Sequence, residues 1–250
     1  MQLLLKTPKI QLSLLLLVIF ITALVNNWSV KPIIPLIATL LATSIVDLAF
    51  LKIRGKPIFF PTAAIATGII IAMLTSSTLP LYDGMLAGVI AMISKNFLRL
   101  EERHIVNPAA VGLFLSAFIF GHNVSWWAVS FQQFAIYDLQ FMIYFLILLS
   151  PALVSVYRMK RHWIILSFLF TYGILNQILN TFLDPTFLFF SIVMLTEPMT
   201  TPNNHTRQIF FGIFIASIVY IFSSMAFSAA FPDVLIAALL LGNILFFKLR

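Results

Sequence analysis

The sequence contains no cysteine and few charged residues. Without cysteine the chain has no disulfides, no thiolate ligands for zinc or iron–sulfur clusters and no cysteine nucleophile. Charged residues make up 9% of the 250 residues, against roughly 25% in typical soluble domains. This is too little charge to cover a soluble surface, and it excludes a soluble globular domain, a disordered chain and a coiled coil.

Apolar residues dominate what is present. They make up 61% of the chain, and the mean hydropathy is +1.05, which indicates an integral membrane protein. In such a protein a net charge of +7 reports orientation more often than a nucleic-acid partner, so we expect no nucleic-acid binding. The four histidines lack metal-ligand spacing and there is no glycine-rich phosphate loop, so we expect no metal site and no direct NAD binding.

The apolar stretches fall into ten segments. Because a helical span needs about 20 apolar residues, they predict an all-α polytopic membrane protein with about ten transmembrane helices. The first segment also resembles the core of a signal peptide, but residues 23–27 make a poor cleavage site and more spans follow, so we interpret it as the first helix. The predicted segments are 10–27, 33–51, 60–75, 81–95, 107–121, 137–157, 162–178, 184–196, 208–226 and 233–248.

Basic residues are distributed asymmetrically between the predicted loops. When alternate loops are assigned to opposite sides, 14 of the 15 Lys and Arg residues fall on one side, and only Lys31 falls on the other. The positive-inside rule places the basic side in the cytoplasm. We therefore predict a multi-pass protein of the inner or plasma membrane, embedded in the lipid bilayer, with both termini in the cytoplasm.

The two halves of the chain share weak features. Pro61-Thr62 and Pro185-Thr186 are 124 residues apart, as are Pro108 and Pro232. Chance similarity between apolar segments is the alternative. We predict a single integral-membrane domain, 1–250, made of a first five-helix repeat (1–124) and a second (125–250). Since five is odd, the repeat is inverted, and its short or broken helices at 60–75 and 184–196 are expected near a ligand.

Three polar features stand out against this background. Asn107-Pro108 reads as a helix start followed by small residues, which suits either close packing or the approach of a flat ligand. Residues 196–202, Thr-Glu-Pro-Met-Thr-Thr-Pro, place a carboxylate and three hydroxyls at the end of a broken helix; they form either a ligand site or a capped interfacial loop. Asp47 lies inside the second segment, where it is either functional or reaches towards the interface near Lys52.

Three stretches of the sequence, taken together, resemble one protein family. They are Thr67-Gly68, the run from Ser94-Lys95 to Asn107-Pro108-Ala109-Ala110, and Thr196 to Pro202. The family comprises the D subunit of Rnf electron-transport complexes and the B subunit of the sodium-translocating NADH:quinone reductase. Its last motif usually has Asp where Glu197 stands.

The resemblance implies a flavin-carrying membrane subunit of a redox-driven ion pump, with other membrane subunits and a quinone or cation as partners. Family members attach FMN covalently to a Thr in a Ser-Gly-Ala-Thr-like motif. No such motif occurs here, so we expect a short member that binds riboflavin or FMN non-covalently. The implied cofactor-binding residues are Thr67, Gly68, Lys95, Asn107, Pro108, Ala109, Thr196, Glu197, Pro198 and Thr200. The candidate ion-pathway residues, chosen as carboxylates within or beside apolar segments, are Asp47 and Glu197.

The resulting hypothesis is a subunit that relays electrons through a flavin, coupled to movement of Na⁺ or H⁺, with no catalytic residue assigned. The alternative is a cofactor-free channel or secondary transporter on the same inverted-repeat scaffold, because fold does not fix function. A third possibility is a subunit that only anchors a redox partner.

Overall fold

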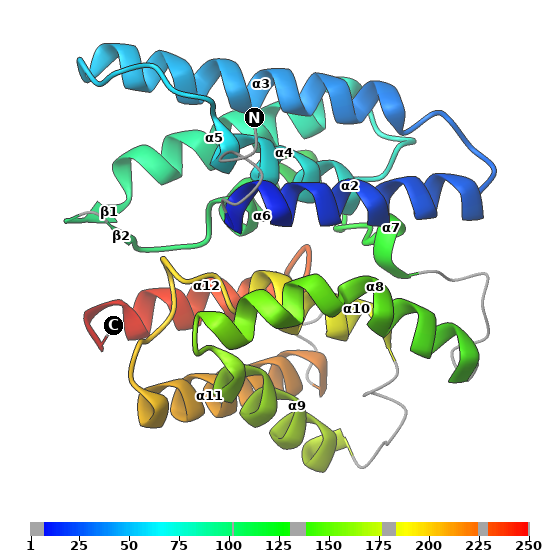
Figure 1. Cartoon of the computed structure of the whole chain (residues 1–250), viewed down its shortest axis with the longest axis vertical. Helices are drawn as coiled ribbons and strands as arrows, with labels where there is room; N and C mark the ends of the chain where they lie inside the picture. Colours follow the sequence, from blue (N-terminus) through cyan, green and yellow to red (C-terminus); the bar gives the residue numbers. More distant parts are fainter. Residues whose placement is uncertain (1–7, 102, 131–138, 177–183, 225–229, 250) are drawn as a thin grey trace. The chain divides into compact units, whose positions relative to one another are not determined.

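The computed structural model describes residues 8–101, 103–130, 139–176, 184–224 and 230–249, and most of them are helical (Figure 1). Each of the ten predicted segments overlaps a helix or a pair of consecutive helices. Residues 137–138, 177–178 and 225–226, at the ends of three predicted segments, lie outside the described residues. The first five helices are α2 Pro8–Asn26, α3 Ile33–Ile53, α4 Thr62–Leu74, α5 Leu81–Phe97 and α6 Pro108–Phe120.

The second half repeats this pattern of long and short helices. Three elements were not expected from the sequence: the two-stranded hairpin β1 (Arg99–Leu100) and β2 (Arg103–His104), and the short helix α7 (Trp127–Ser130). The other elements are α8 Leu139–Arg158, α9 His162–Asn176, α10 Pro185–Phe189, the π-helix η2 Phe190–Met194, α11 His205–Ser224, α12 Val234–Phe246 and the 3-10 turn η4 Phe247–Leu249.

Three of the described helices are long and apolar enough to cross a membrane unaided: Lys9–Asn26, Ile33–Ile53 and His205–Ser223. Residues 143–158 and 162–176 pass the same test only as a pair, and they are bent by 118° at the break between them. The described part of the chain therefore has three or four candidate spans by length and composition. That all ten helices cross the membrane stays a prediction.

The short apolar helices occupy the same places in both halves. They are the third and fifth helices of each: α4, α6 and α12 have 13 residues each, and α10 with η2 has 10. A helix of 13 residues is about 20 Å long, which is less than the ~30 Å hydrocarbon core of a bilayer. Asp184 and Asp233 cap the two short helices of the second half by accepting hydrogen bonds from Thr186 N and Ile236 N.

The chain divides into two compact units. Unit 1 contains residues 1–99 and 108–129, and unit 2 contains residues 100–107 and 130–250. In unit 1, α2 and α3 pack against α4, α3 packs against α5, and α5 packs against α6. In unit 2, α8 and α9 pack against η2, α9 packs against α11, and α11 packs against α12.

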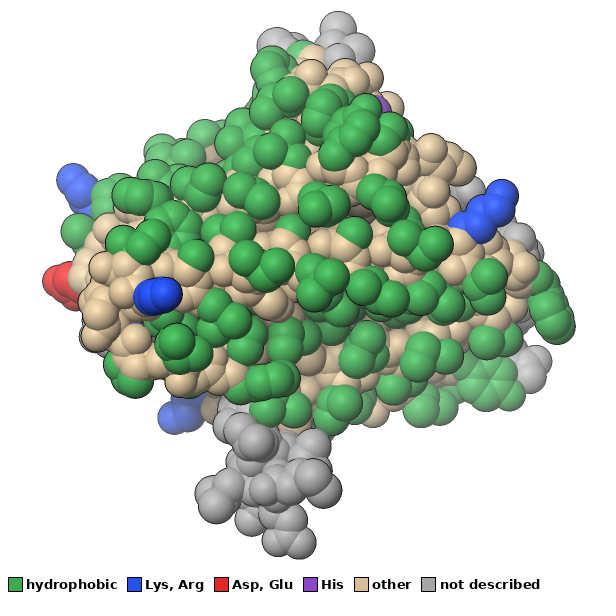
Figure 2. Space-filling model, turned by 90° about the horizontal axis from the view of Figure 1, so that it is seen from above, with side chains coloured by type: hydrophobic (Ala, Val, Ile, Leu, Met, Phe, Trp, Pro, Cys, Tyr) green, Lys and Arg blue, Asp and Glu red, His purple; other side chains and the backbone are tan. Residues whose placement is uncertain are grey.

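Helix α3 buries polar side chains and exposes apolar ones, the reverse of a helix in a soluble protein. Thr39, Thr43 and Asp47 are buried, whereas Ile34 and Ile45 are each 62% exposed. Large exposed apolar side chains also occur on the other long helices, and Figure 2 shows apolar side chains spread across the face it displays. Polar groups turned inwards and apolar groups turned outwards are what a lipid environment requires.

Close packing between α5 and α6 depends on Gly112. A Cβ at this position would overlap the carbonyl oxygen of Ala87 and press on Ala91, both on α5. Because a backbone carbonyl cannot rotate away, we predict that Gly112→Ala lowers stability by about 1–3 kcal/mol, measured by thermal unfolding in detergent. Gly84→Ala is the control, since it meets only the Thr39 hydroxyl, which can turn aside. An unfolding midpoint for Gly112→Ala equal to that of the wild type would contradict this packing.

Candidate functional site

A π-helical turn interrupts the short helix of unit 2. Helix α10 runs directly into η2, where the Leu195 N–H donates to the Phe190 carbonyl at 2.8 Å, five residues back. All five residues of η2 are buried. Such π-turns are rare and occur often at functional sites. The helix then ends in residues 196–202, which we term the exit loop.

The threonines of the exit loop stabilise the loop itself. The Thr196 hydroxyl donates to the Ile192 carbonyl, and the Thr201 hydroxyl donates to the Glu197 carbonyl at 2.8 Å. The Thr200 hydroxyl lies 3.3 Å from both the carbonyl oxygen and Oε2 of Glu197. All three threonines are buried. Their side chains are therefore used in holding the turn rather than offered at the surface.

Two asparagines join the exit loop to the rest of unit 2. Asn243, fully buried on α12, accepts from the Asn107 N–H at 2.8 Å and donates to the Thr200 carbonyl at 3.4 Å. The Asn107 side chain donates to the Met194 carbonyl at the end of η2, at 3.4 Å. The sequence reading identified Asn107 but missed Asn243. The signal for Asn243 in the sequence was its amide side chain within the last apolar segment.

Two arginines, Arg103 and Arg161, hold the same two carbonyls of the exit loop. Arg103 Nη2 donates to Pro198 O at 2.6 Å and to Thr201 O at 3.3 Å. Arg161 donates from Nη1 to Thr201 O at 3.3 Å and from Nη2 to Pro198 O at 3.4 Å, and its Nη2 also bonds to Asn203 Oδ1. We term these residues the arginine pair. The sequence reading counted both only as indicators of orientation.

The arginine pair concentrates positive charge beside the loop. Arg161 is 4% exposed. Its burial and, to a smaller extent, the charge of Arg103 lower the pKa of the Arg161 guanidinium to about 10. Because this pKa remains far above neutral, both arginines are protonated at physiological pH. Every acceptor that the described part of the chain gives them is a neutral oxygen.

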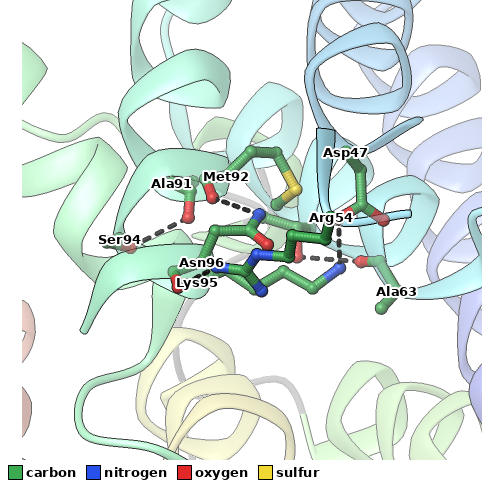
Figure 3. Close-up of polar contacts among 9 residues, drawn as sticks. Asp47, Arg54, Ala63, Ala91, Met92, Ser94, Lys95 and Asn96 are labelled. Atoms are coloured by element: carbon green, nitrogen blue, oxygen red, sulfur yellow. Dashed lines mark hydrogen bonds and ion pairs between the residues drawn. The ribbon is translucent and has the colours of Figure 1, made fainter. Parts of the chain in front are cut away.

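A separate charged cluster lies inside unit 1 (Figure 3). The Lys95 ammonium on α5 lies 2.7 Å from Asp47 Oδ1 on α3, and Asp47 is 5% exposed. Beside them Arg54 donates to the Asn96 carbonyl. Asp47 therefore pairs with Lys95 across two helices and does not reach towards Lys52. A buried ion pair of this kind is costly to break from one side.

The predicted residues on α4 and α6 contribute mainly to packing within unit 1. A Cβ on Gly68 would overlap Thr43 and Leu40 of α3, so the open face of this glycine is already filled. Thr67 is half-buried and donates to the Ala63 carbonyl at 2.9 Å. Pro108 and Ala109 are buried at the start of α6. None of these contacts requires a ligand.

The structure thus divides the predicted cofactor-binding residues between the two units. Thr67, Gly68, Lys95, Pro108 and Ala109 belong to unit 1. Asn107, Thr196, Glu197, Pro198 and Thr200 belong to unit 2, where hydrogen bonds bring them together. Within this group the half-buried residues are Glu197, Pro198 and the adjacent Met199. These three residues, with half-buried Arg103, form the accessible edge of the exit loop.

A further polar cluster, which the sequence reading also missed, lies elsewhere in unit 1. Asp83 is 2% exposed, accepts a hydrogen bond from the Ser116 hydroxyl, and lies 3.1 Å from Nε2 of His122, with which it forms an ion pair when His122 is protonated. A small pocket lined by these three residues and by Thr75 and Leu113 opens beside them. Because Ser116 donates to Asp83 and not to His122, this arrangement does not activate a serine nucleophile.

The Asp47–Lys95 pair gives a prediction about stability. Asp47→Asn leaves the half-buried Lys95 ammonium without its charged partner, so we expect a loss of about 1.5–3 kcal/mol, seen as a lower unfolding midpoint in detergent. The double variant Asp47→Asn/Lys95→Met removes both charges and should recover much of that loss. Lys52→Met, at an exposed position near the end of α3, is the matched control. Additive losses in the double variant would show that the two charges do not interact.

Comparison with known proteins adds independent information. The model of the NQR2, RnfD, RnfE family matches residues 5–248, nearly the whole chain. No curated protein matches the sequence.

Proposed function

Because the chain belongs to the NQR2, RnfD, RnfE family, whose members are membrane subunits of ion-translocating electron-transport complexes, we propose that it relays electrons through a non-covalently bound flavin. Neighbouring membrane subunits would supply and accept the electrons, with a quinone or a cation as further partner. The family match carries this proposal. The exit loop is the place in the structure that suits it best.

The proposed architecture is an inverted repeat of five helices, with both termini in the cytoplasm. Its support is the packing order, which is the same in the two units. In each, the third helical element lies at the centre: nine of the 13 residues of α4 are buried, as are all five of η2. Shared packing order and matching short helices are what an inverted-repeat transporter fold presents.

Residue contacts separated by 124 positions support the same repeat. A Cβ on Gly88 of α5 would overlap Thr43 of α3. A Cβ on Gly212 of α11 would overlap Ser167 of α9. The spacing from Thr43 to Ser167 and from Gly88 to Gly212 is 124 residues in both cases, the same as between the matching prolines.

The hydroxyls at these two positions also bond alike. Thr43 donates to the carbonyls of Thr39 and Leu40, four and three residues back. Ser167 donates to the carbonyls of Trp163 and Ile164, again four and three residues back. The same local bonding at the same offset supports common ancestry of the two halves over chance.

The types of residue in and beside the exit loop suit a flavin. Members of the family bind FMN, and a bound flavin supplies reversible electron transfer. The edge formed by Glu197, Pro198 and Met199 offers a carboxylate to accept hydrogen bonds and apolar groups to exclude water. Arg103 offers donors and positive charge. Arg161 Nε, which is buried without a partner in the described part of the chain, is a further donor. Since the sequence lacks Ser-Gly-Ala-Thr, the flavin is held without a covalent bond.

Asp47 is the proposed ion-pathway residue of unit 1. Its carboxylate is already neutralised by Lys95 at 2.7 Å. A Na⁺ ion or a proton that uses Asp47 would therefore have to displace the ammonium. Movement of Lys95 is then the step that would couple ion binding to a change in the protein.

The flavin proposal is tested by purifying the full chain in detergent from flavin-replete cells. We expect a yellow protein whose visible flavin absorbance is released by acid or denaturant, since no covalent link forms. Glu197→Gln keeps the size of the side chain but removes the charge, and should lower the flavin content severalfold. Glu101→Gln, in the turn between β1 and β2, is the matched control.

A colourless wild-type protein would contradict the proposal. Flavin retained in full by Glu197→Gln would exclude the exit-loop edge as its site. Solute or sodium flux in proteoliposomes made from the colourless chain would favour the channel or transporter alternative.

A further inference from the structure

The arginine pair carries more positive charge than holding a loop requires. Two guanidiniums reach the carbonyls of Pro198 and Thr201, although a single neutral donor to each would satisfy them. Carbonyl dipoles stabilise a cation but do not neutralise it. Placing two like charges together in a largely buried site is unfavourable unless a negative group joins them.

Unused donors lie on both members of the pair. Arg161 Nε is buried and has no hydrogen-bond partner among the residues that the structure describes. Arg103 is half-buried, and its bonds to the loop use only Nη2, so Nε and Nη1 take no part in them. Glu197, the carboxylate of the exit loop, lies with Oε2 3.3 Å from the Thr200 hydroxyl. The pair therefore combines a double positive charge with a buried Arg161 Nε and with two N–H positions of Arg103 that do not bond to the loop.

We propose that Arg103 and Arg161 form a binding site for a phosphate group, as a dianionic phosphate monoester. Guanidinium N–H groups donate charge-assisted hydrogen bonds to phosphate oxygens, and two guanidiniums match the charge of a dianion. This inference rests on the proposed function for the source of the phosphate, which would be the flavin itself. The chain would then prefer FMN to riboflavin. A lipid phosphomonoester or free phosphate has the same chemistry.

The test compares FMN with riboflavin, which lacks only the phosphate. Binding of each to the purified full chain is measured by fluorescence titration in detergent. We expect the wild type to prefer FMN about tenfold or more. Because Arg103 also lies at the edge proposed for the flavin, Arg103→Gln should weaken FMN binding more than riboflavin binding, so that the preference is lost. Residual riboflavin binding shows that the variant is folded. Arg158→Gln, an exposed arginine of unit 2 near the same turn, should behave as the wild type.

A merely structural role of the arginine pair gives different results. If Arg103→Gln weakens FMN and riboflavin equally, Arg103 only holds the loop and the inference is overturned. Equal affinity of the wild type for the two flavins overturns it as well, and leaves the proposed function intact. Arg161→Lys provides a second variant, because it keeps the charge but removes the Nε donor, and should reduce the FMN preference in part.

If the chain binds neither flavin, the proposed function is contradicted. The phosphate site is then tested without a flavin. Thermal unfolding is measured in inorganic phosphate against chloride at equal ionic strength, and in vesicles of phosphatidylcholine with or without phosphatidic acid. The site is supported if phosphate or phosphatidic acid stabilises the wild type and Arg158→Gln but not Arg103→Gln. The probe that stabilises the protein then identifies the source of the phosphate group. No stabilisation by phosphate or by phosphatidic acid overturns the inference.

Discussion

The structure of unit 2 depends on one constraint, which is that backbone carbonyls freed by a break in an apolar helix must find partners within the protein. The π-turn of η2 ends a helix of ten residues and releases the exit loop. Four side chains from separate parts of unit 2 donate to carbonyls of the exit loop or to the Met194 carbonyl just before it. They are Arg103 of β2, Asn107 just before α6, Arg161 in the turn between α8 and α9, and Asn243 of α12. The loop is therefore where the elements of this unit meet.

The two units share a packing order but differ in the charge they enclose. In unit 1 the charges on α3 and α5 cancel, because Lys95 lies against Asp47. In unit 2 the oxygens that accept from the arginine pair, within the part of the chain that the structure describes, are neutral. Unit 1 thus holds a neutral ion pair, and unit 2 holds a positive, donor-rich site. This difference suits a division of roles, with an ion-responsive carboxylate in unit 1 and an anionic cofactor in unit 2.

Hydropathy was sufficient to predict the apolar helices other than α7, because runs of apolar residues and the prolines that interrupt them are local features. The short third and fifth helices of the first half and the capping position of Asp184 were predictable on the same grounds. The π-turn, the arginine pair and Asn243 were not, since each gains its role only from partners far away in the sequence. Thr196 and Thr200 show the opposite error: their hydroxyls look available in the sequence, but the folded loop turns them inwards. Gly68 resembled part of a ligand site, yet α3 fills the space beside it.

The central claim is that the exit loop is both the structural junction of unit 2 and the edge that meets the flavin. Hydrogen–deuterium exchange of the full chain, with and without added FMN, tests it most directly. The account predicts slower exchange on FMN binding in residues 194–202 and 103–107, with little change in α2 and α3. Protection that is absent from the exit loop, or that appears instead around α3 and α4, would contradict it.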